Sequence, residues 1–252
     1  MKPFTRLLSA LAAILVSIAV QAGPVVIIKA DDFRVPNQAW TNFLDASRAA
    51  GIKVSIGIIT ESITGNATTA DWLQAEEKRG DVEFWDHGWD HKQWKVDGQT
   101  VSEFSGSGLD HQREHFSHAQ ATLKTALGHD VAVFGAPYNA FDTNTATIIN
   151  ETPAIRLFFA HNVRLARSLV DKRVTVIDVI SETGGTGKPD AAGFEALWAK
   201  RAAAGHLTEP VSLQFHPPYF DTPHLAEYVK IIAFLKAQGC DIKLPSECIA
   251  SQ

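Results

Sequence analysis

The stretch Val25-Val26-Ile27-Ile28-Lys29-Ala30-Asp31-Asp32-Phe33 joins an apolar, β-branched run to two adjacent carboxylates. An apolar run of this length is typical of a buried strand. Because neighbouring strand residues point to opposite faces, Asp31 and Asp32 can share one site only where the strand is ending. The stretch therefore predicts a strand over residues 25–30 with an acidic site at its carboxyl end.

Strand and helix patterns alternate along the rest of the chain. Six further apolar runs predict buried strands, at residues 53–59, 82–86, 131–135, 155–160, 174–180 and 210–216. Helical patterns lie between them, near residues 37–50, 69–79, 109–128, 143–151, 190–204 and 223–239. This alternation implies an α/β fold with parallel strands and right-handed crossovers. Seven such units in one domain suit a (β/α) barrel better than an open sheet, although periodicity alone does not decide between them.

The N-terminus carries the pattern of a signal peptide. Two positive charges precede an apolar stretch of fourteen residues, Leu7 to Val20, which is too short to span a bilayer comfortably. The small residues that a signal peptidase requires follow at Val20-Gln21-Ala22. We therefore expect a signal peptide over residues 1–22, a mature domain over residues 23–252, and a periplasmic or secreted protein. An uncleaved anchor is the alternative.

The charge and the cysteines limit the partners. The formal net charge is −5, and it becomes −7 without Lys2 and Arg6 of the signal peptide, which argues against nucleic acid or an anionic membrane surface as the main partner. No later segment approaches twenty apolar residues, so no stable membrane insertion is expected after signal removal. Cys240 and Cys248 are the only cysteines, and in an exported protein we expect them to form a disulfide, with two buried free thiols as the alternative.

Three further segments follow predicted strands, and the middle one is Gly135-Ala136-Pro137-Tyr138-Asn139 after the strand at 131–135. His87 and His91 come four residues apart after the strand at 82–86, and His216 ends the strand at 210–216. One carboxylate and two histidines can hold a zinc-type cation while leaving positions open for water and substrate. A second carboxylate and a third histidine are then left for general base and general acid catalysis.

Together, these segments resemble the polysaccharide deacetylases, the NodB-like domains of the carbohydrate esterase family 4 type. That family has an Asp-Asp pair after the first strand, an H-x-x-x-H motif, an R-x-P-Y motif and a Leu/His strand end. The resemblance runs in order from about Val25 to about Tyr219. It departs at Gly135, where the family has arginine, and at the family's fourth motif, for which Asp178 is the nearest counterpart. The chain therefore resembles a divergent member.

The resemblance implies an irregular, roughly seven-stranded barrel that removes N-acetyl groups from amino sugars of a glycan. It implies a divalent metal, with Zn²⁺ as the first choice and Co²⁺ or Ni²⁺ as alternatives. Its site residues would be Asp32, His87 and His91 as metal ligands, Asp31 as the base, His216 as the general acid, and Tyr138, whose backbone N–H would stabilise the oxyanion. Arg164, Arg167 or Lys29 could supply the cation that is missing at Gly135.

Substrate contacts are expected from three residues near these motifs. Trp89 lies inside the second motif and offers an aromatic face for a sugar ring, as Trp94 does nearby. Asn139 and Asp142 follow the third motif and are polar candidates.

A second H-x-x-x-H spacing competes with the first. His111 and His115, followed by His118, lie on a clear helix beside its apolar stripe, which includes Phe116 and Leu123. Their position predicts a solvated helix face rather than a metal site. His129, His161, His206 and His224 show no partner pattern and are interpreted as loop or surface residues.

Three other functions fit parts of the pattern. The departures from the family motifs allow a different C–N or ester hydrolase on the same scaffold, or a non-catalytic glycan-binding relative. One carboxylate with two histidines also suits non-haem iron, so an iron oxygenase is a third alternative. The strand–helix alternation disfavours the oxygenase, and the retention of Asp31 and His216 disfavours the non-catalytic relative.

Overall fold

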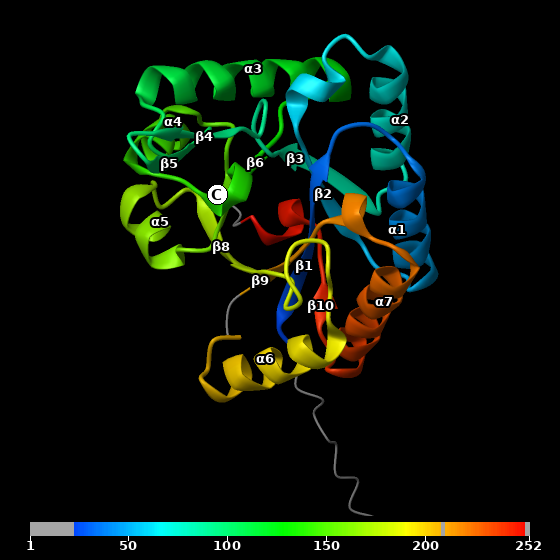
Figure 1. The fold of residues 1–252 in the computed structure, drawn as a ribbon. Helices are drawn as coiled ribbons and strands as arrows, with labels where there is room; N and C mark the ends of the chain where they lie inside the picture. Colours follow the sequence, from blue (N-terminus) through cyan, green and yellow to red (C-terminus); the bar gives the residue numbers. More distant parts are fainter. Residues whose placement is uncertain (1–22, 208–209, 250–252) are drawn as a thin grey trace, which may run out of the picture.

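The computed structural model describes residues 23–207 and 210–249 and shows a closed parallel barrel (Figure 1). Seven strands pair in the order β1-β2-β3-β6-β7-β8-β9, and β9 pairs with β1 to close the ring. The predicted α/β barrel is therefore confirmed. The seven barrel strands are β1 (Val25–Phe33), β2 (Val54–Ile58), β3 (Val82–Asp86), β6 (Val133–Phe134), β7 (Leu157–Ala160), β8 (Thr175–Ile180) and β9 (Val211–Phe215).

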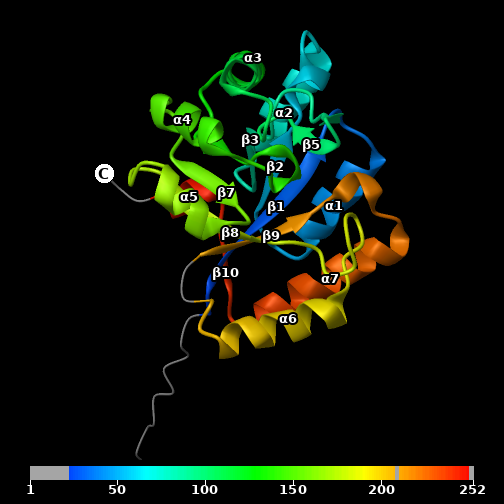
Figure 2. The ribbon, with the colours of Figure 1, turned by 60° about the vertical axis from the view of Figure 1, so that its left-hand side comes forward.

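Helices cover the outside of the barrel, as Figures 1 and 2 show from two directions. They are α1 (Gln38–Ala49), α2 (Ala67–Glu77), α3 (Leu109–Leu127), α4 (Thr143–Glu151), α5 (Val163–Leu169), α6 (Ala191–Ala203) and α7 (Thr222–Ala237). The sequence pattern predicts six of these helices and misses the short α5. No helix among the described residues is long and apolar enough to cross a membrane.

Because neighbouring residues of a strand point to opposite faces, each strand contributes to apolar packing both outside and inside the barrel. On β1, Val26 and Ile28 face outward and pack in a cluster with helix residues such as Trp40. Ile27 faces inward and packs with Trp85 and Phe159 in a separate cluster inside the barrel. Continuing the same alternation toward the carboxyl ends brings polar residues of several strands into the top of the barrel.

A β-hairpin that the sequence pattern did not predict lies between β3 and α3. It consists of β4 (Gln93–Val96) and β5 (Gln99–Ser102), joined by Asp97 and Gly98, which both have positive φ. Asp-Gly is a favoured pair for such a two-residue turn. The hairpin brings Trp94 against His111 of α3, with ring centroids 5.5 Å apart.

The two cysteines are free, so the expected disulfide is wrong and the alternative of two thiols holds. Cys240, just before β10 (Asp241–Ile242), packs against the outer cluster, whereas Cys248 packs against the cluster inside the barrel. They therefore approach opposite sides of the barrel wall. Burial raises the pKa of each thiol to about 11, which keeps both protonated at neutral pH. The predicted signal peptide lies outside the described residues.

Candidate active site

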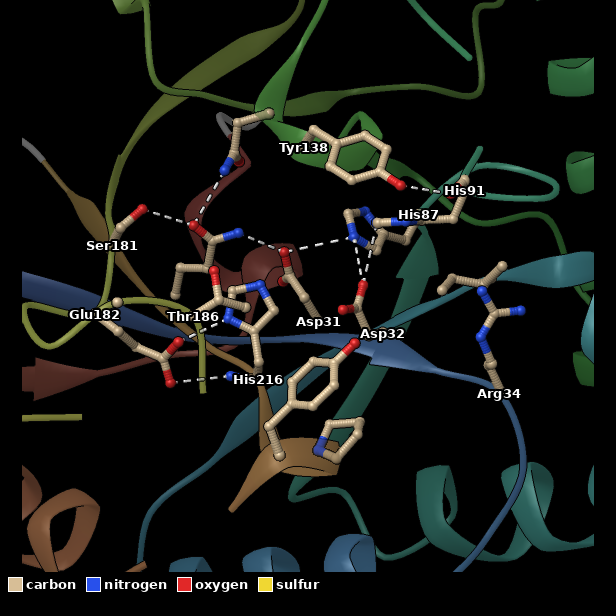
Figure 3. A pocket seen from close by; sticks show the side chains of 16 residues that line it. Asp31, Asp32, Arg34, His87, His91, Tyr138, Ser181, Glu182, Thr186 and His216 are labelled. Atoms are coloured by element: carbon tan, nitrogen blue, oxygen red, sulfur yellow. Dashed lines mark hydrogen bonds and ion pairs between the residues drawn. The ribbon is translucent and has the colours of Figure 1, made fainter. Parts of the chain in front are cut away.

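A cavity of about 670 Å³ opens at the carboxyl ends of the barrel strands (Figure 3). Parallel barrels gather their functional loops at this end. The cavity is lined by Asp31, Asp32, Arg34, Ile59, His87, His91, Tyr138, Asn139, Ser181, Glu182, Gly185, Thr186, Gln214, His216, Pro218 and Tyr219.

A kink in β1 places both neighbouring carboxylates in this cavity. Asp32 has a φ of 68°, and the pairing of β1 with β2 is irregular between Ala30 and Phe33. The strand therefore does not end at the pair, as the sequence interpretation supposed; it continues to Phe33 through a bulge. The bulge turns Asp32 to the same side as Asp31.

The carboxylate of Asp32 faces two imidazoles. Its Oδ1 lies 3.4 Å from His87 Nε2 and 3.2 Å from His91 Nε2. Two ligand atoms bound to one tetrahedral zinc-type ion lie about 3.3 Å apart, so the three atoms have the spacing of a ligand set. Within the described part of the chain, Asp32 Oδ1 is also buried without a hydrogen-bond partner.

The tautomer of His87 supports the same arrangement. Its Nδ1 lies 2.7 Å from the carbonyl oxygen of Gly135 and donates a hydrogen bond to it. The other ring nitrogen, Nε2, then faces Asp32 Oδ1. A metal ion between these two atoms would be bound by both, and a carbonyl partner of this kind is typical of a metal-binding histidine. The residues present therefore fit a divalent metal.

Backbone strain is concentrated at the cavity. Five non-glycine residues have positive φ in the described ranges, and four of them line the cavity: Asp32, His91, Tyr138 and Asn139. The fifth, Asp97, lies in the hairpin turn. Such conformations are costly and persist where the surrounding structure fixes them, which is common at functional sites.

Asp31 lies at the floor of the cavity and is fully buried. Both of its oxygens accept hydrogen bonds from Lys29 Nζ, at 2.7 and 2.5 Å, and Oδ2 also accepts one from Gln214 Nε2 at 2.7 Å. Burial alone would raise the pKa of Asp31, but the charge of Lys29, followed by those of His87 and His216, holds this pKa below its ordinary value. Asp31 is therefore an ionised carboxylate beside the ligand set.

His216 faces Asp31 and Asp32 from the other side of the cavity, as Figure 3 shows. Its Nδ1 donates to Glu182 Oε2 at 2.7 Å, and its backbone N–H donates to the other oxygen of Glu182 at 3.2 Å. Burial would lower the pKa of His216, but the hydrogen bond to Glu182 and the charge of Asp31 raise it above its ordinary value. This arrangement directs a proton on Nε2 into the cavity.

Tyr138 sits in a short 3-10 turn, Pro137–Asn139, after β6. The N–H groups at the start of such a turn have no partner within the turn, so that of Tyr138 is available to a ligand. The Tyr138 hydroxyl donates to the carbonyl oxygen of His91 at 2.8 Å, and the two rings lie 4.3 Å apart. Tyr138 therefore contacts His91, one of the three candidate metal ligands, through both its hydroxyl and its ring.

Of the three expected substrate contacts, only Asn139 lines the cavity, where its Nδ2 donates to Gln214 Oε1 at 3.0 Å. Asp142 instead caps α4 by accepting the N–H groups of Asn144 and Thr145. Trp89 packs on His118, with ring centroids 5.3 Å apart, and does not line the cavity. Neither Asp142 nor Trp89 therefore lies at the cavity wall.

The predicted solvated face of α3 holds for the exposed His118 but is wrong for His111 and His115, which are partly buried. His115 is half-buried, and its Nδ1 lies 3.2 Å from Glu103 Oε1 and 3.8 Å from Asp90 Oδ1. The fully buried Glu103 also accepts the backbone N–H groups of Trp89 and His91, at 2.6 and 2.8 Å. Both oxygens of Glu103 therefore already accept hydrogen bonds, and Glu103 holds the loop around Trp89 and His91 in place. The unpredicted hairpin is what covers this helix face.

Sequence reasoning missed several residues that shape the cavity. Glu182 lies two residues beyond β8, at the end where barrel sites form, and that position was an available signal. Asp178, the suggested counterpart of the family's fourth motif, instead forms an ion pair with Arg201 of α6. His161 had no partner pattern, yet its Nε2 lies 2.9 Å from Ser181 Oγ at the cavity wall.

The family model for polysaccharide deacetylase matches residues 20–154, more than half of the chain. No curated protein matches the sequence.

Three solved structures show the same fold at low identity. A family 4 acetyl xylan esterase from Clostridium thermocellum, in complex with a cobalt ion, has a TM-score of 0.61 and 14% identity, covering 89% of each chain. A peptidoglycan N-acetylglucosamine deacetylase has a TM-score of 0.58 and 14% identity, covering 92% of each chain. A family 4 pseudoenzyme from Bacillus anthracis has a TM-score of 0.57 and 12% identity, covering 90% of this chain and 66% of that one.

Proposed function

Because this chain belongs to the polysaccharide deacetylase family, we propose that it is a metal-dependent deacetylase that removes N-acetyl groups from amino sugars of a glycan. The observation that carries the proposal is the pairing of an ionised Asp31 with a protonatable His216 on two sides of one ligand set. Hydrolysis of an amide needs a base for the attacking water and an acid for the departing amine.

Asp32, His87 and His91 would hold the metal. Zn²⁺ suits one carboxylate with two imidazoles, and Co²⁺ or Ni²⁺ are the alternatives. A cation bound there supplies Lewis acidity, which polarises the acyl carbonyl and lets water lose a proton near neutral pH. Three protein ligands leave room for water and substrate on the cavity side.

The remaining groups handle protons and charge. Asp31 is fixed by Lys29 and Gln214, and it accepts the proton of the attacking water. The backbone N–H of Tyr138 donates to the oxygen that becomes negative when the carbonyl is attacked. Asn139 lines the wall of the same cavity and is the proposed substrate contact that remains.

His216 protonates the leaving nitrogen. An amine leaves a tetrahedral carbon only after its nitrogen gains a proton, so the amide reaction depends on a positioned acid. Glu182 supplies both the orientation of the imidazole and the raised pKa of His216. His216 held by Glu182 therefore supplies the proton that amide hydrolysis requires.

Replacing Glu182 by glutamine should move the alkaline limb of the pH profile to lower pH. The pKa of His216 is raised in the parent, so its acid form persists to higher pH than in a free histidine. Without the anionic partner, burial dominates and the pKa falls, so activity is lost at a pH lower by about one unit. The measurement is kcat/KM for an N-acetylated sugar between pH 5 and 10 in both proteins. An unchanged limb would contradict the role of His216.

An aryl acetate provides the control for this variant. Its phenolate leaves without a proton, so Glu182→Gln should slow the aryl ester far less than the amide at the same pH. Equal losses on both substrates would mean that Glu182 supports the fold of the cavity rather than proton donation.

The proposed function is tested by incubating the metal-loaded protein with N-acetylated and O-acetylated oligosaccharides. We expect equal amounts of acetate and free amine from the first and much less acetate from the second. Acetate from the O-acetylated substrate alone would make the protein an esterase. Binding without release of acetate from either substrate would make it a glycan-binding relative.

We also propose that the protein is exported. The N-terminal pattern supports removal of residues 1–22 and a mature protein that begins at Gly23 in the periplasm or outside the cell. N-terminal sequencing of the protein recovered from those fractions tests it, and an intact Met1 there would contradict cleavage.

A further inference from the structure

A tryptophan lies in the layer of the barrel beneath the cavity, among the apolar side chains that pack inside the barrel. Trp85 of β3 is fully buried, and its indole lies over two glycines on the neighbouring strands or their ends. A Cβ atom at Gly57 would lie 2.4 Å from the Trp85 ring, and one at Gly135 would lie 2.7 Å from it. The indole therefore occupies the space that side chains from positions 57 and 135 would need.

A lysine lies directly against this indole. Lys29 is fully buried, and its Nζ lies 4.7 Å from the centroid of the Trp85 ring and 5.7 Å from that of Phe159. Aromatic faces attract a cation at this distance. The same Nζ makes the two hydrogen bonds to Asp31, so the ammonium lies between the aromatic floor and the carboxylate.

Burying a lysine in this way is costly unless its charge is matched. A buried ammonium without a partner would lose its hydration with nothing to replace it, so it needs the paired carboxylate and the aromatic faces together. The two arginines that the sequence offered as alternative cations beside the base lie elsewhere. Arg164 is exposed on α5, and Arg167 donates to the carbonyl of Val176. Neither lines the cavity.

We propose that Lys29 is the positioning residue that fixes the orientation of Asp31, and that the Trp85 ring, by occupying the space beside Gly135, prevents a side chain at position 135 from taking this role. The cation thus comes from the same strand as the base, two residues away on the same face. The inference rests on the proposed function for its kinetic consequence, but the pairing itself is independent of any activity.

A residue that acts only through Asp31 has a distinct kinetic effect. Lys29→Met keeps a long apolar side chain over Trp85 but removes the charge and both hydrogen bonds to Asp31. We expect kcat to fall about 10²-fold, the cost of a misplaced catalytic group, while KM and metal content stay near the parent values. In the Asp31→Asn background, the same substitution should change kcat less than threefold, because no base remains to be positioned.

Thermal unfolding of the metal-free protein gives a readout that does not depend on activity. Lys29→Met leaves a buried carboxylate unpaired and should lower Tm by about 10 °C. Adding Asp31→Asn removes the unpaired charge and should recover at least half of that loss. Lys53→Met is the matched control: Lys53 is exposed in an ion pair with Glu247, so its loss should change neither kcat nor Tm appreciably.

The outcomes separate the two proposals. A parent with no deacetylase activity would defeat the proposed function, while recovery of Tm in the double variant would still establish the pairing. A Lys29→Met protein with parental kcat, or one equally impaired with and without Asp31, would overturn the positioning role. If Lys29→Met does not fold, a folded double variant confirms the pairing, and one that also fails to fold overturns it.

Discussion

Replacing Asp31 by asparagine should lower kcat by about 10²–10⁴-fold while the metal content stays near that of the parent. The amide keeps the size of the side chain and its contact with Gln214, but it cannot accept the proton of the attacking water. Asp31 Oδ2 lies 3.5 Å from His87 Nε2, but both Asp31 oxygens already accept hydrogen bonds from Lys29 or Gln214, so we place Asp31 beside the ligand set. Turnover of an N-acetylated sugar and metal analysis of the same sample measure both effects.

The neighbouring aspartate provides the contrast. Asp32→Asn replaces the anionic ligand candidate by a neutral amide, so metal binding should weaken and activity should return when excess metal is added. If Asp31→Asn were fully active, the proposed mechanism would be wrong. If Asp31→Asn lost the metal and Asp32→Asn kept it, the roles of the two carboxylates would be reversed.

Replacing His91 by alanine should lower metal affinity by at least about 100-fold. Loss of a group that only supports a ligand already costs 10–100-fold, and His91 is proposed as a ligand itself. Its Nε2 lies 3.2 Å from Asp32 Oδ1 across the site. Metal bound per chain after dialysis should fall from about one to near zero, and activity should fall with it.

The second histidine pair is the control for this experiment. His111 packs against Trp94, and His115 pairs with Glu103, both away from the cavity. The His111→Ala/His115→Ala protein should still bind about one metal per chain, although it should unfold at a lower temperature. Loss of metal from this variant and not from His91→Ala would mean that His111 and His115, not His87 and His91, bind the metal.

The barrel could be predicted because its signals are local. Each strand is buried on both faces, so each is a short apolar run, and the helices between them carry clear periodicity. The regions that the sequence did not predict depend on other signals. The β4–β5 hairpin is exposed and polar on most positions, so only its Asp97-Gly98 turn marks it. The α5 helix is a single short segment of seven residues.

The ligand candidates could be predicted because they cluster in short motifs at strand ends. Their supporting residues could not, because the contacts join distant segments. Glu182 reaches His216 across 34 positions of the sequence, and Glu103 holds the backbone of His91 from the far end of the hairpin. The sequence alone offers Lys29 as a possible cation beside Asp31. Only the packing of Trp85 over Gly135 explains why a glycine stands where the family has arginine.

The substrate contacts show the limit of proximity in sequence. Asp142 follows the third motif by three residues, yet an aspartate before a helical pattern is also a frequent N-cap, and here that role prevails. Trp89 lies inside the second motif, but the backbone at this loop turns its ring outward onto His118. Adjacent residues of a loop can therefore face opposite sides of the barrel wall.

Anomalous X-ray scattering at the zinc edge, from crystals of the protein grown with Zn²⁺, tests the central claim most directly. We expect one strong peak per chain, about 2.0–2.2 Å from Asp32 Oδ1, His87 Nε2 and His91 Nε2. A peak between Asp90, Glu103 and His115 instead, or no peak in the cavity at a saturating Zn²⁺ concentration, would contradict the account.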